Sequence, residues 1–157
     1  MSKPMLTVLA TAGVFMLPSL AQARPVAFEV KLKNYGGDGA YLALYVTDKA
    51  GAYKGTLWVA GRKSKYHRHL AGWARASRGQ ARLDGVTGAS VGAGRTLKVT
   101  TDLADALIDA GFEVHVDAAV ENMRDSPDDA KIALTAAGAG KTTQGRGYVA
   151  SLAYHLP

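Results

Sequence analysis

Hydrophobic and polar residues alternate along the early part of the chain. From Val26 to Lys33 every second residue is apolar, a period that is typical of a strand with one buried face. A glycine-rich turn at 34–39 follows, and Tyr41–Thr47 and Tyr53–Ala60 form two further strand-like runs on either side of a turn at 48–51. These runs predict an antiparallel meander of three strands.

The apolar spacing becomes helical between Lys65 and Ser77. Tyr66, Leu70 and Trp73 recur at positions i, i+4 and i+7, with basic residues between them. This spacing places the three side chains on one face of a helix. We therefore expect one short amphipathic helix here.

The rest of the chain again favours strands. A loop is expected at Asp84–Gly94, and Asp102–Ala110 is ambiguous because its leucine and isoleucine spacing suits one or two helical turns. Strands are expected at Thr96–Thr100, Phe112–Val120 and Tyr148–Leu156. Strands separated by turns, without alternating helices, favour a mainly β fold, an antiparallel β-sandwich with one short helix.

The first 23 residues have the features of a secretory signal peptide. Lys3 precedes an apolar run that ends at Leu20, and Ala21-Gln22-Ala23 supplies small residues for cleavage. Polar residues interrupt the run, which is too short to cross a bilayer comfortably. We expect cleavage after Ala23, no stable membrane insertion, and a soluble exported domain that spans residues 24–157.

Composition removes several kinds of chemistry. None of the 157 residues is cysteine, which excludes disulfides, cysteine-based zinc sites, iron–sulfur clusters and thiol catalysis. Redox chemistry would therefore need another cofactor.

Charge is unevenly distributed along the chain. The segment Lys49–Arg82 holds nine Lys or Arg and no acid, whereas Asp102–Asp129 holds nine of the thirteen acids. Such a basic block suits nucleic acid, but the signal peptide directs the protein away from it, so no nucleic-acid partner is expected. A solvated face, a phosphate-bearing cofactor and an acidic partner stay open as explanations.

Most other candidate motifs lack a necessary part. Residues 135–142 resemble a phosphate-binding loop but have Thr135 in place of its first glycine, so a flexible loop is expected. His67 and His69 would share a face only on a strand, and the expected helix makes them solvated or phosphate-facing cations instead of metal ligands. His115 and His155 are expected to be packed or strand-edge residues.

One run of small residues remains, Asp84-Gly85-Val86-Thr87-Gly88-Ala89-Ser90. By composition it is a turn. It also resembles the acceptor motif Asp-x-x-Thr/Ser-Gly-Ala-Thr/Ser, on which exported flavin transferases of the ApbE type attach FMN through a phosphodiester bond. The resemblance implies that Ser90 is the acceptor and that Asp84, Thr87, Gly88 and Ala89 complete the motif.

The resemblance extends over most of the chain. Tyr41–Asp48, Thr56–Trp58, Lys65-Tyr66 and Trp73–Ser77, followed by the acceptor-like motif, resemble the periplasmic family called domain of unknown function 2271. It covers roughly Phe28 to the carboxyl terminus. Members are similar to an immunoglobulin-like β-sandwich and often occur alongside membrane reductases with PepSY domains.

The resemblance implies a periplasmic electron carrier with FMN on Ser90, loaded by an ApbE-type FMN transferase and reduced by a PepSY-type membrane reductase. Arg75 is among the cations expected near the added phosphate, and Trp73, Tyr66 and Trp58 are candidates for an aromatic face beside the flavin. Two alternatives stay open. One is a flavin-free binding or accessory module, related to metal or haem uptake, and the other is a reductase that acts directly on a small substrate.

Overall fold

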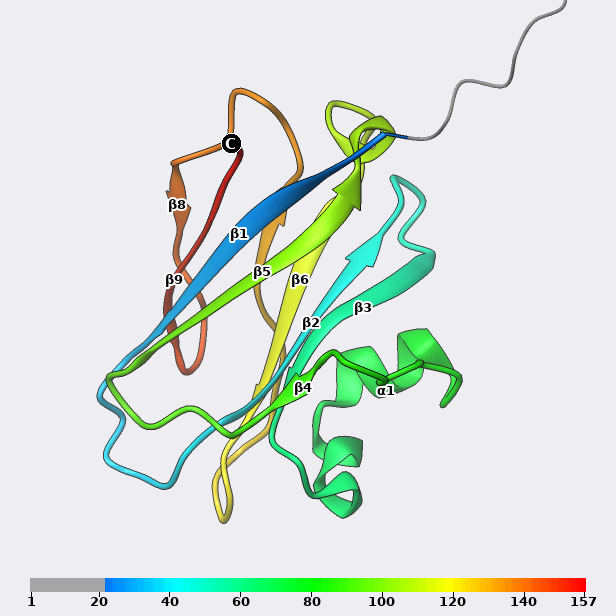
Figure 1. Ribbon diagram of the computed structural model, residues 1–157. Helices are drawn as coiled ribbons and strands as arrows, with labels where there is room; N and C mark the ends of the chain where they lie inside the picture. The colour runs from blue at the N-terminus through cyan, green and yellow to red at the C-terminus, as the bar shows by residue number, and fades with distance from the viewer. Residues whose placement is uncertain (1–21) are drawn as a thin grey trace, which may run out of the picture.

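Residues 22–157 are described by a computed structural model, and most of them lie in two β-sheets (Figure 1). The expected signal peptide falls outside the described residues except for its last two, and Ala23 is the first residue of β1. The four-stranded sheet has the order β5–β1–β9–β8, made of Thr96–Ala104, Ala23–Leu32, Val149–His155 and Thr142–Thr143.

The second sheet has five strands in the order β4–β3–β2–β6–β7. All strand pairs in the two sheets are antiparallel except β3 with β4, which is parallel. The five strands are Thr87–Gly88, Tyr53–Ala60, Tyr41–Thr47, Glu113–Ala119 and Ser126–Ala133. The fold is therefore the mainly β sandwich that the sequence predicts. The expected meander of three strands is wrong, however, because β1 pairs with β5 and β9 in the other sheet and not with β2.

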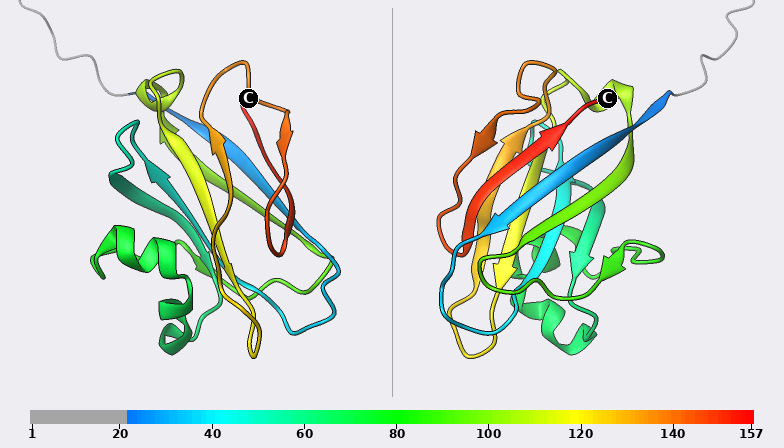
Figure 2. Two further views of the ribbon diagram at one scale, coloured as in Figure 1. Left: turned by 180° about the vertical axis from the view of Figure 1, so that it is seen from behind. Right: turned by 60° about the vertical axis from the view of Figure 1, so that its left-hand side comes forward.

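The main core lies between the two sheets, which Figure 2 shows as one layer in front of the other. The period of two in β1 directs its alternate apolar side chains inward, and Phe28 is 0% exposed. Leu42 and Leu44 of β2 face it from the other sheet and are also 0% exposed. Burial of each such side chain stabilises the fold by roughly 1.5–3 kcal/mol.

A second apolar cluster covers the outer face of the five-stranded sheet. Leu70 and Trp73 pack there against Ala43 and Tyr45 of β2 and against Val59 of β3. Because β2 is buried on both faces, its sequence is apolar almost throughout.

The expected single helix is two helical segments. A 3₁₀ helix, η1 (Ser64–His69), is followed by the α-helix α1 (Ala71–Ser77), and Leu70 between them has non-helical φ and ψ of −81° and 65°. Leu70 is fully buried. This break lets Leu70 anchor the segment to the sheet while α1 begins in a new direction, as seen beside β4 in Figure 1.

Other expectations need correction as well. β5 continues to Ala104, so the ambiguous segment begins as strand and then forms the short 3₁₀ helix η2 (Asp105–Leu107). β7 was not expected, because Pro127 and the two aspartates that follow it have low strand propensity. The expected loop at Asp84–Gly94 contains the strand β4. Residues 135–142 form turns that lead into β8 and no helix follows them, unlike a phosphate-binding loop.

Candidate functional site

The acceptor-like segment lies on the surface and presents its polar side chains to solvent. Asp84, Thr87, Ala89 and Ser90 are exposed, and Gly88 is half-buried. Asp84 and Gly85 form a turn in which Gly85 has φ +73°, a conformation that glycine adopts without strain. The Ser90 hydroxyl is thus accessible from outside the molecule.

Hydrogen bonds hold the segment at both of its ends. Val59 N donates to Val86 O, and Gly61 N donates to Gly88 O, both at 2.8 Å. On the other side Val91 exchanges two backbone hydrogen bonds with Ala40, at 2.7 and 2.9 Å. Ser90 therefore lies between two fixed points of the backbone.

Gly88 is required by its contact with Trp58. A Cβ atom at Gly88 would lie 2.6 Å from Trp58 Cζ2, far inside van der Waals contact. The indole packs against the main core, and its buried Nε1 has no hydrogen-bond partner within residues 22–157. Packing against Trp58 therefore requires glycine at this position of the acceptor-like motif.

Ser90 lines a cavity of about 540 Å³ at the end of the sandwich where β2 begins and β6 ends. This volume is in the usual range for small-molecule sites, roughly 300–1,000 Å³. Residues from three other parts of the chain, 38–41, 63–69 and 119–125, join Ser90 there, among them Tyr41, Lys63, Tyr66, His69, Met123 and Asp125.

Gly61 determines how the aromatic wall of this cavity is built. Its φ of +109° favours glycine, and any Cβ there would overlap the ring of Tyr41. Tyr41 meets Tyr66 edge to face, with ring centroids 5.7 Å apart. His67 Nε2 donates to Gly61 O at 2.8 Å, which fixes η1 against the end of β3.

A hydrogen bond joins two of the segments that line the cavity. His69 Nδ1 lies 3.0 Å from Asp125 Oδ2 and ties η1 to the turn between β6 and β7. His67 and His69 therefore have separate partners. Within residues 22–157 no cluster of three or more His, Cys, Asp or Glu side chains is arranged to hold a metal.

The structure does not bring Trp73 and Arg75 to Ser90. Trp73 is 5% exposed, and its Nε1 donates to Thr56 Oγ1 at 2.9 Å under α1. Arg75 is exposed on α1 and lies near Tyr45. Neither residue is among those that line the cavity, whereas Tyr66, the other helical aromatic, is.

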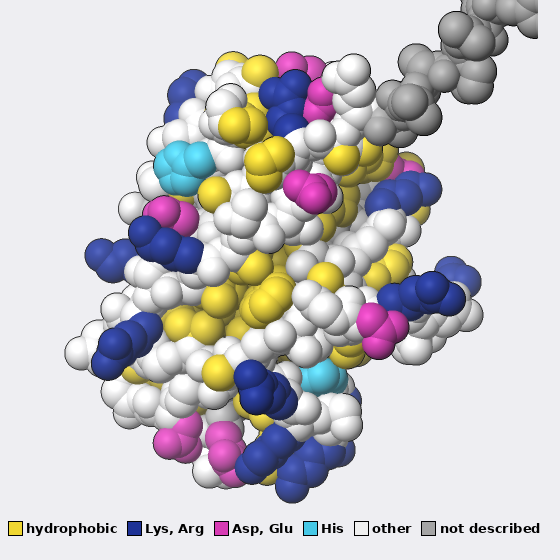
Figure 3. Space-filling view, in the orientation of Figure 1, with side chains coloured by type: hydrophobic (Ala, Val, Ile, Leu, Met, Phe, Trp, Pro, Cys, Tyr) yellow, Lys and Arg dark blue, Asp and Glu magenta, His cyan; other side chains and the backbone are white. Residues whose placement is uncertain are grey.

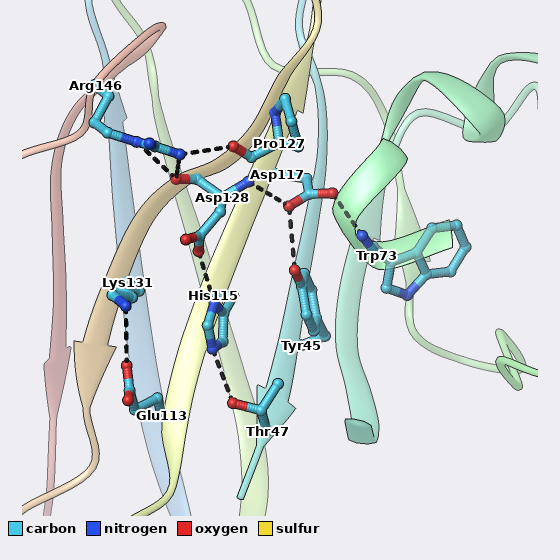
Figure 4. A network of polar contacts seen from close by, with 10 residues as sticks. All are labelled: Tyr45, Thr47, Trp73, Glu113, His115, Asp117, Pro127, Asp128, Lys131 and Arg146. Atoms are coloured by element: carbon cyan, nitrogen blue, oxygen red, sulfur yellow. Dashed lines mark hydrogen bonds and ion pairs between the residues drawn. The ribbon is translucent and has the colours of Figure 1, made fainter. Parts of the chain in front are cut away.

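A polar network lies on the outer face of the five-stranded sheet (Figure 4). Asp117 is fully buried and accepts hydrogen bonds from Trp73 N at 2.6 Å, Asp128 N at 2.8 Å and Tyr45 Oη at 3.3 Å. Burial raises the pKa of Asp117, and it raises the pKa of Tyr45 as well. Asp117 thus joins the start of α1 to β2 and β7.

The same face holds a row of three polar side chains. Thr47 Oγ1 is 2.8 Å from His115 Nε2, and His115 Nδ1 is 2.7 Å from Asp128 Oδ1. The order resembles a hydrolase triad. However, Thr47 is 5% exposed, and Tyr45 stacks on the histidine ring at 5.2 Å. With no access to the hydroxyl, the row serves to join β2, β6 and β7. The sequence signal that could have revealed this polar face is the spacing of His115 and Asp117. Residues two apart on a strand have their side chains on the same face of the sheet.

Comparison with known proteins gives one family and no individual relative. The family described as predicted periplasmic protein, DUF2271, matches residues 23–151. The searches of curated proteins and of solved structures found no significant match. Within the described residues no helix is both long and apolar enough to cross a membrane.

Proposed function

The chain belongs to the DUF2271 family of predicted periplasmic proteins, and from this premise we propose that it is a periplasmic electron carrier with FMN joined to Ser90 Oγ by a phosphoester. The observation that carries the proposal is the exposed Ser90 hydroxyl at a cavity of about 540 Å³ whose lining includes two tyrosines, one lysine and three acidic residues. An FMN transferase of the ApbE type attaches the flavin, and a membrane reductase with a PepSY domain supplies the electrons. The signal peptide directs export and is cleaved after Ala23.

The attachment is a phosphoryl transfer that needs an activated flavin nucleotide. With flavin adenine dinucleotide as donor, Ser90 Oγ forms a bond to the flavin-side phosphorus, and the pyrophosphate P–O bond breaks. AMP leaves with the bonding electrons, and a base of the transferase takes the hydroxyl proton. A narrow, exposed segment suits this reaction, because the acceptor must enter the active site of another protein. Gly85, Gly88 and Ala89 carry no bulky side chain that would obstruct entry.

Part of the lining around Ser90 suits FMN, although Asp38, Glu121 and Asp125 also line the cavity and do not favour a phosphate. Tyr41 and Tyr66 offer aromatic surface for the flavin ring, and Met123 offers a polarizable apolar contact. Lys63 supplies positive charge for the phosphate. We therefore assign the contacts first expected of Trp73 and Arg75 to Tyr41, Tyr66 and Lys63.

The bound flavin would supply reversible electron transfer, which the side chains of this protein cannot provide themselves. The protein itself would position the flavin at its attachment point and shield it from solvent. The hydrogen bonds of Val86, Gly88 and Val91 hold the attachment point still. The contact between His69 and Asp125 joins two of the segments that line the cavity. A covalent link also retains the flavin in a compartment where a free one would diffuse away.

The test is the intact mass of the exported protein after co-expression with an FMN transferase. We expect a mature chain that begins at Arg24 and carries an added ~438 Da, the mass of FMN less water. Ser90→Ala should lose the added mass completely. Thr96→Ala is the matched control, because it removes an exposed hydroxyl from β5, outside the acceptor-like segment, and should keep the flavin.

An unmodified mature chain, obtained while a known acceptor protein is modified in the same cells, would exclude the flavin proposal. The protein would then be a flavin-free binding module. Loss of the added mass in Thr87→Ala but not in Ser90→Ala would move the acceptor to Thr87. A mature chain that begins elsewhere would correct the cleavage site alone.

A further inference from the structure

Seven cations crowd into the segment that forms the helical lobe, which we define as residues 62–82. They are all exposed, and the segment holds no acidic residue: Arg62, Lys63, Lys65, Arg68, Arg75, Arg78 and Arg82. Among residues 22–157 none of these seven side chains forms an ion pair. Figure 3 shows Lys and Arg side chains gathered at the lower right, over this lobe.

Asp125 binds His69 of the lobe, and Asp38 and Glu121 line the cavity beside it, but most other acids of the described residues have partners outside the lobe. Asp105 pairs with Arg24, and Glu113 pairs with Lys131. Asp117 and Asp129 are buried and bound by backbone N–H groups. The seven exposed cations therefore outnumber the three acids beside them, and such an excess of charge steers an oppositely charged partner.

The lobe also forms one wall of the cavity. Lys63, Tyr66 and His69 belong to it and line the same space as Ser90. A partner bound to the lobe would thus lie beside the cavity. This position matters for an electron carrier, since its partner must approach the redox group closely.

We propose that the helical lobe is the docking surface for an acidic face of the protein that exchanges electrons with the Ser90 site, an inference that rests on the proposed function. Five of the seven cations are arginines, which bind carboxylates through two parallel hydrogen bonds. A protein is favoured over an anionic membrane, because Met123 is the one large apolar side chain that is exposed in the described residues. A membrane-binding surface needs an apolar face that enters the bilayer.

The surface is tested first with the flavin-free chain and a fluorescent poly-glutamate peptide. We expect binding at ~20 mM salt that is largely lost at ~200 mM, as for charges screened over a short distance. The variant Arg62→Glu/Arg68→Glu should weaken binding roughly tenfold, in line with the loss and reversal of two exposed charge contacts. The matched control Lys31→Glu/Lys141→Glu changes the net charge equally from exposed positions outside the lobe, and it should weaken binding less than about twofold.

Equal weakening by the two variants would show that net charge alone acts and would overturn the proposal. Stronger, lobe-dependent binding to phosphatidylglycerol vesicles than to the peptide would also overturn it, in favour of a membrane. Neither readout uses the flavin, so a failure here is distinct from a failure of FMN attachment.

The second measurement joins the surface to the redox site. In flavin-loaded protein, each hexacyanoferrate(III) ion takes one electron from the reduced flavin, as does each hexaammineruthenium(III) ion. The Arg62→Glu/Arg68→Glu variant should slow the reaction with the anionic oxidant and accelerate the reaction with the cationic one. Unchanged rates with both oxidants would separate the lobe from the redox site and refute the proposal, whereas absence of loaded flavin would refute the proposed function alone.

Discussion

Gly88 packs directly on the Trp58 indole, and its replacement by alanine tests how the acceptor segment is positioned. The new Cβ would lie 2.6 Å from Trp58 Cζ2, whereas ordinary contacts begin at 3.4 Å. One of the two groups must therefore move by at least about 0.4 Å, and by about 0.8 Å to restore an ordinary contact. The indole packs against the main core, whereas β4 has only two residues and few hydrogen bonds to the β3 side. We expect β4 to move away and to take Ser90 with it.

The expected cost follows from the size of this overlap. Addition of one methyl group to a closely packed site lowers the free energy of unfolding by about 1–3 kcal/mol. For a domain of this size the melting temperature should fall by roughly 3–10 °C. Gly55→Ala is the matched control on β3, because nothing lies within 4 Å of its Cβ position. It should be neutral or stabilise slightly, by up to about 1 kcal/mol.

The assay is urea unfolding of both single variants and of a double-mutant cycle with Trp58→Leu. If the indole is the obstacle, Gly88→Ala should cost little in the Trp58→Leu background, which gives a coupling energy of about 1 kcal/mol or more. Equal stabilities of Gly88→Ala and Gly55→Ala would refute the reasoning. A Gly88→Ala cost that persists without the indole would assign the restriction to another neighbour.

Two further predictions concern buried polar groups. Asp117→Asn should lower the free energy of unfolding by about 1–3 kcal/mol at pH 7, because asparagine keeps one accepting oxygen and one of the two backbone N–H groups that bind the carboxylate loses its acceptor. Burial raises the pKa of Asp117, so the stabilisation from its proton is full below the ordinary carboxyl pKa of about 3.9 and is lost as pH rises through the raised pKa. The advantage of wild type over Asp117→Asn should therefore be larger at pH 4 than at pH 7 in urea unfolding, and a smaller advantage at pH 4 would contradict the sign. Tyr154→Phe should cost about 1–3 kcal/mol, since its hydroxyl accepts from Thr135 N at 2.8 Å and donates to Thr135 O in a side chain that is 0% exposed. Tyr35→Phe, which loses an exposed hydrogen bond to Asp38 O, should cost less than about 1 kcal/mol in thermal unfolding, and equal losses would remove burial as the cause.

The strands that the sequence predicts best are those whose local pattern matches their final burial. β2 and β3 have the expected bounds, because each begins and ends at a turn signal and has enough apolar residues to fill a buried face. β7 was missed since Asp128 and Asp129 are poor strand residues by propensity. Their carboxylates bind His115 and the backbone of residues 147–149, and these partners are distant in sequence.

The sequence likewise predicts one part of the candidate site and misses another. The acceptor-like segment Asp84–Ser90 could be picked out because a motif is contiguous in sequence. The aromatic wall could not, since Tyr41 enters the cavity only because Gly61 leaves space for its ring. Trp73 was a candidate flavin contact because its side chain is aromatic, but it is buried in the packing under α1.

By itself, the sequence determined the alternation that makes a β-sandwich, the break between sheet and helix, the concentration of cations in residues 62–82, and the small residues that keep Ser90 accessible. These features depend on neighbours within a few positions. Only the tertiary structure decided that β4 pairs with β3, that η1 closes a cavity over Tyr41, and that the cations lie beside Ser90. Such pairings are selected by hydrogen bonds and packing between segments far apart in the chain, and no local pattern specifies them.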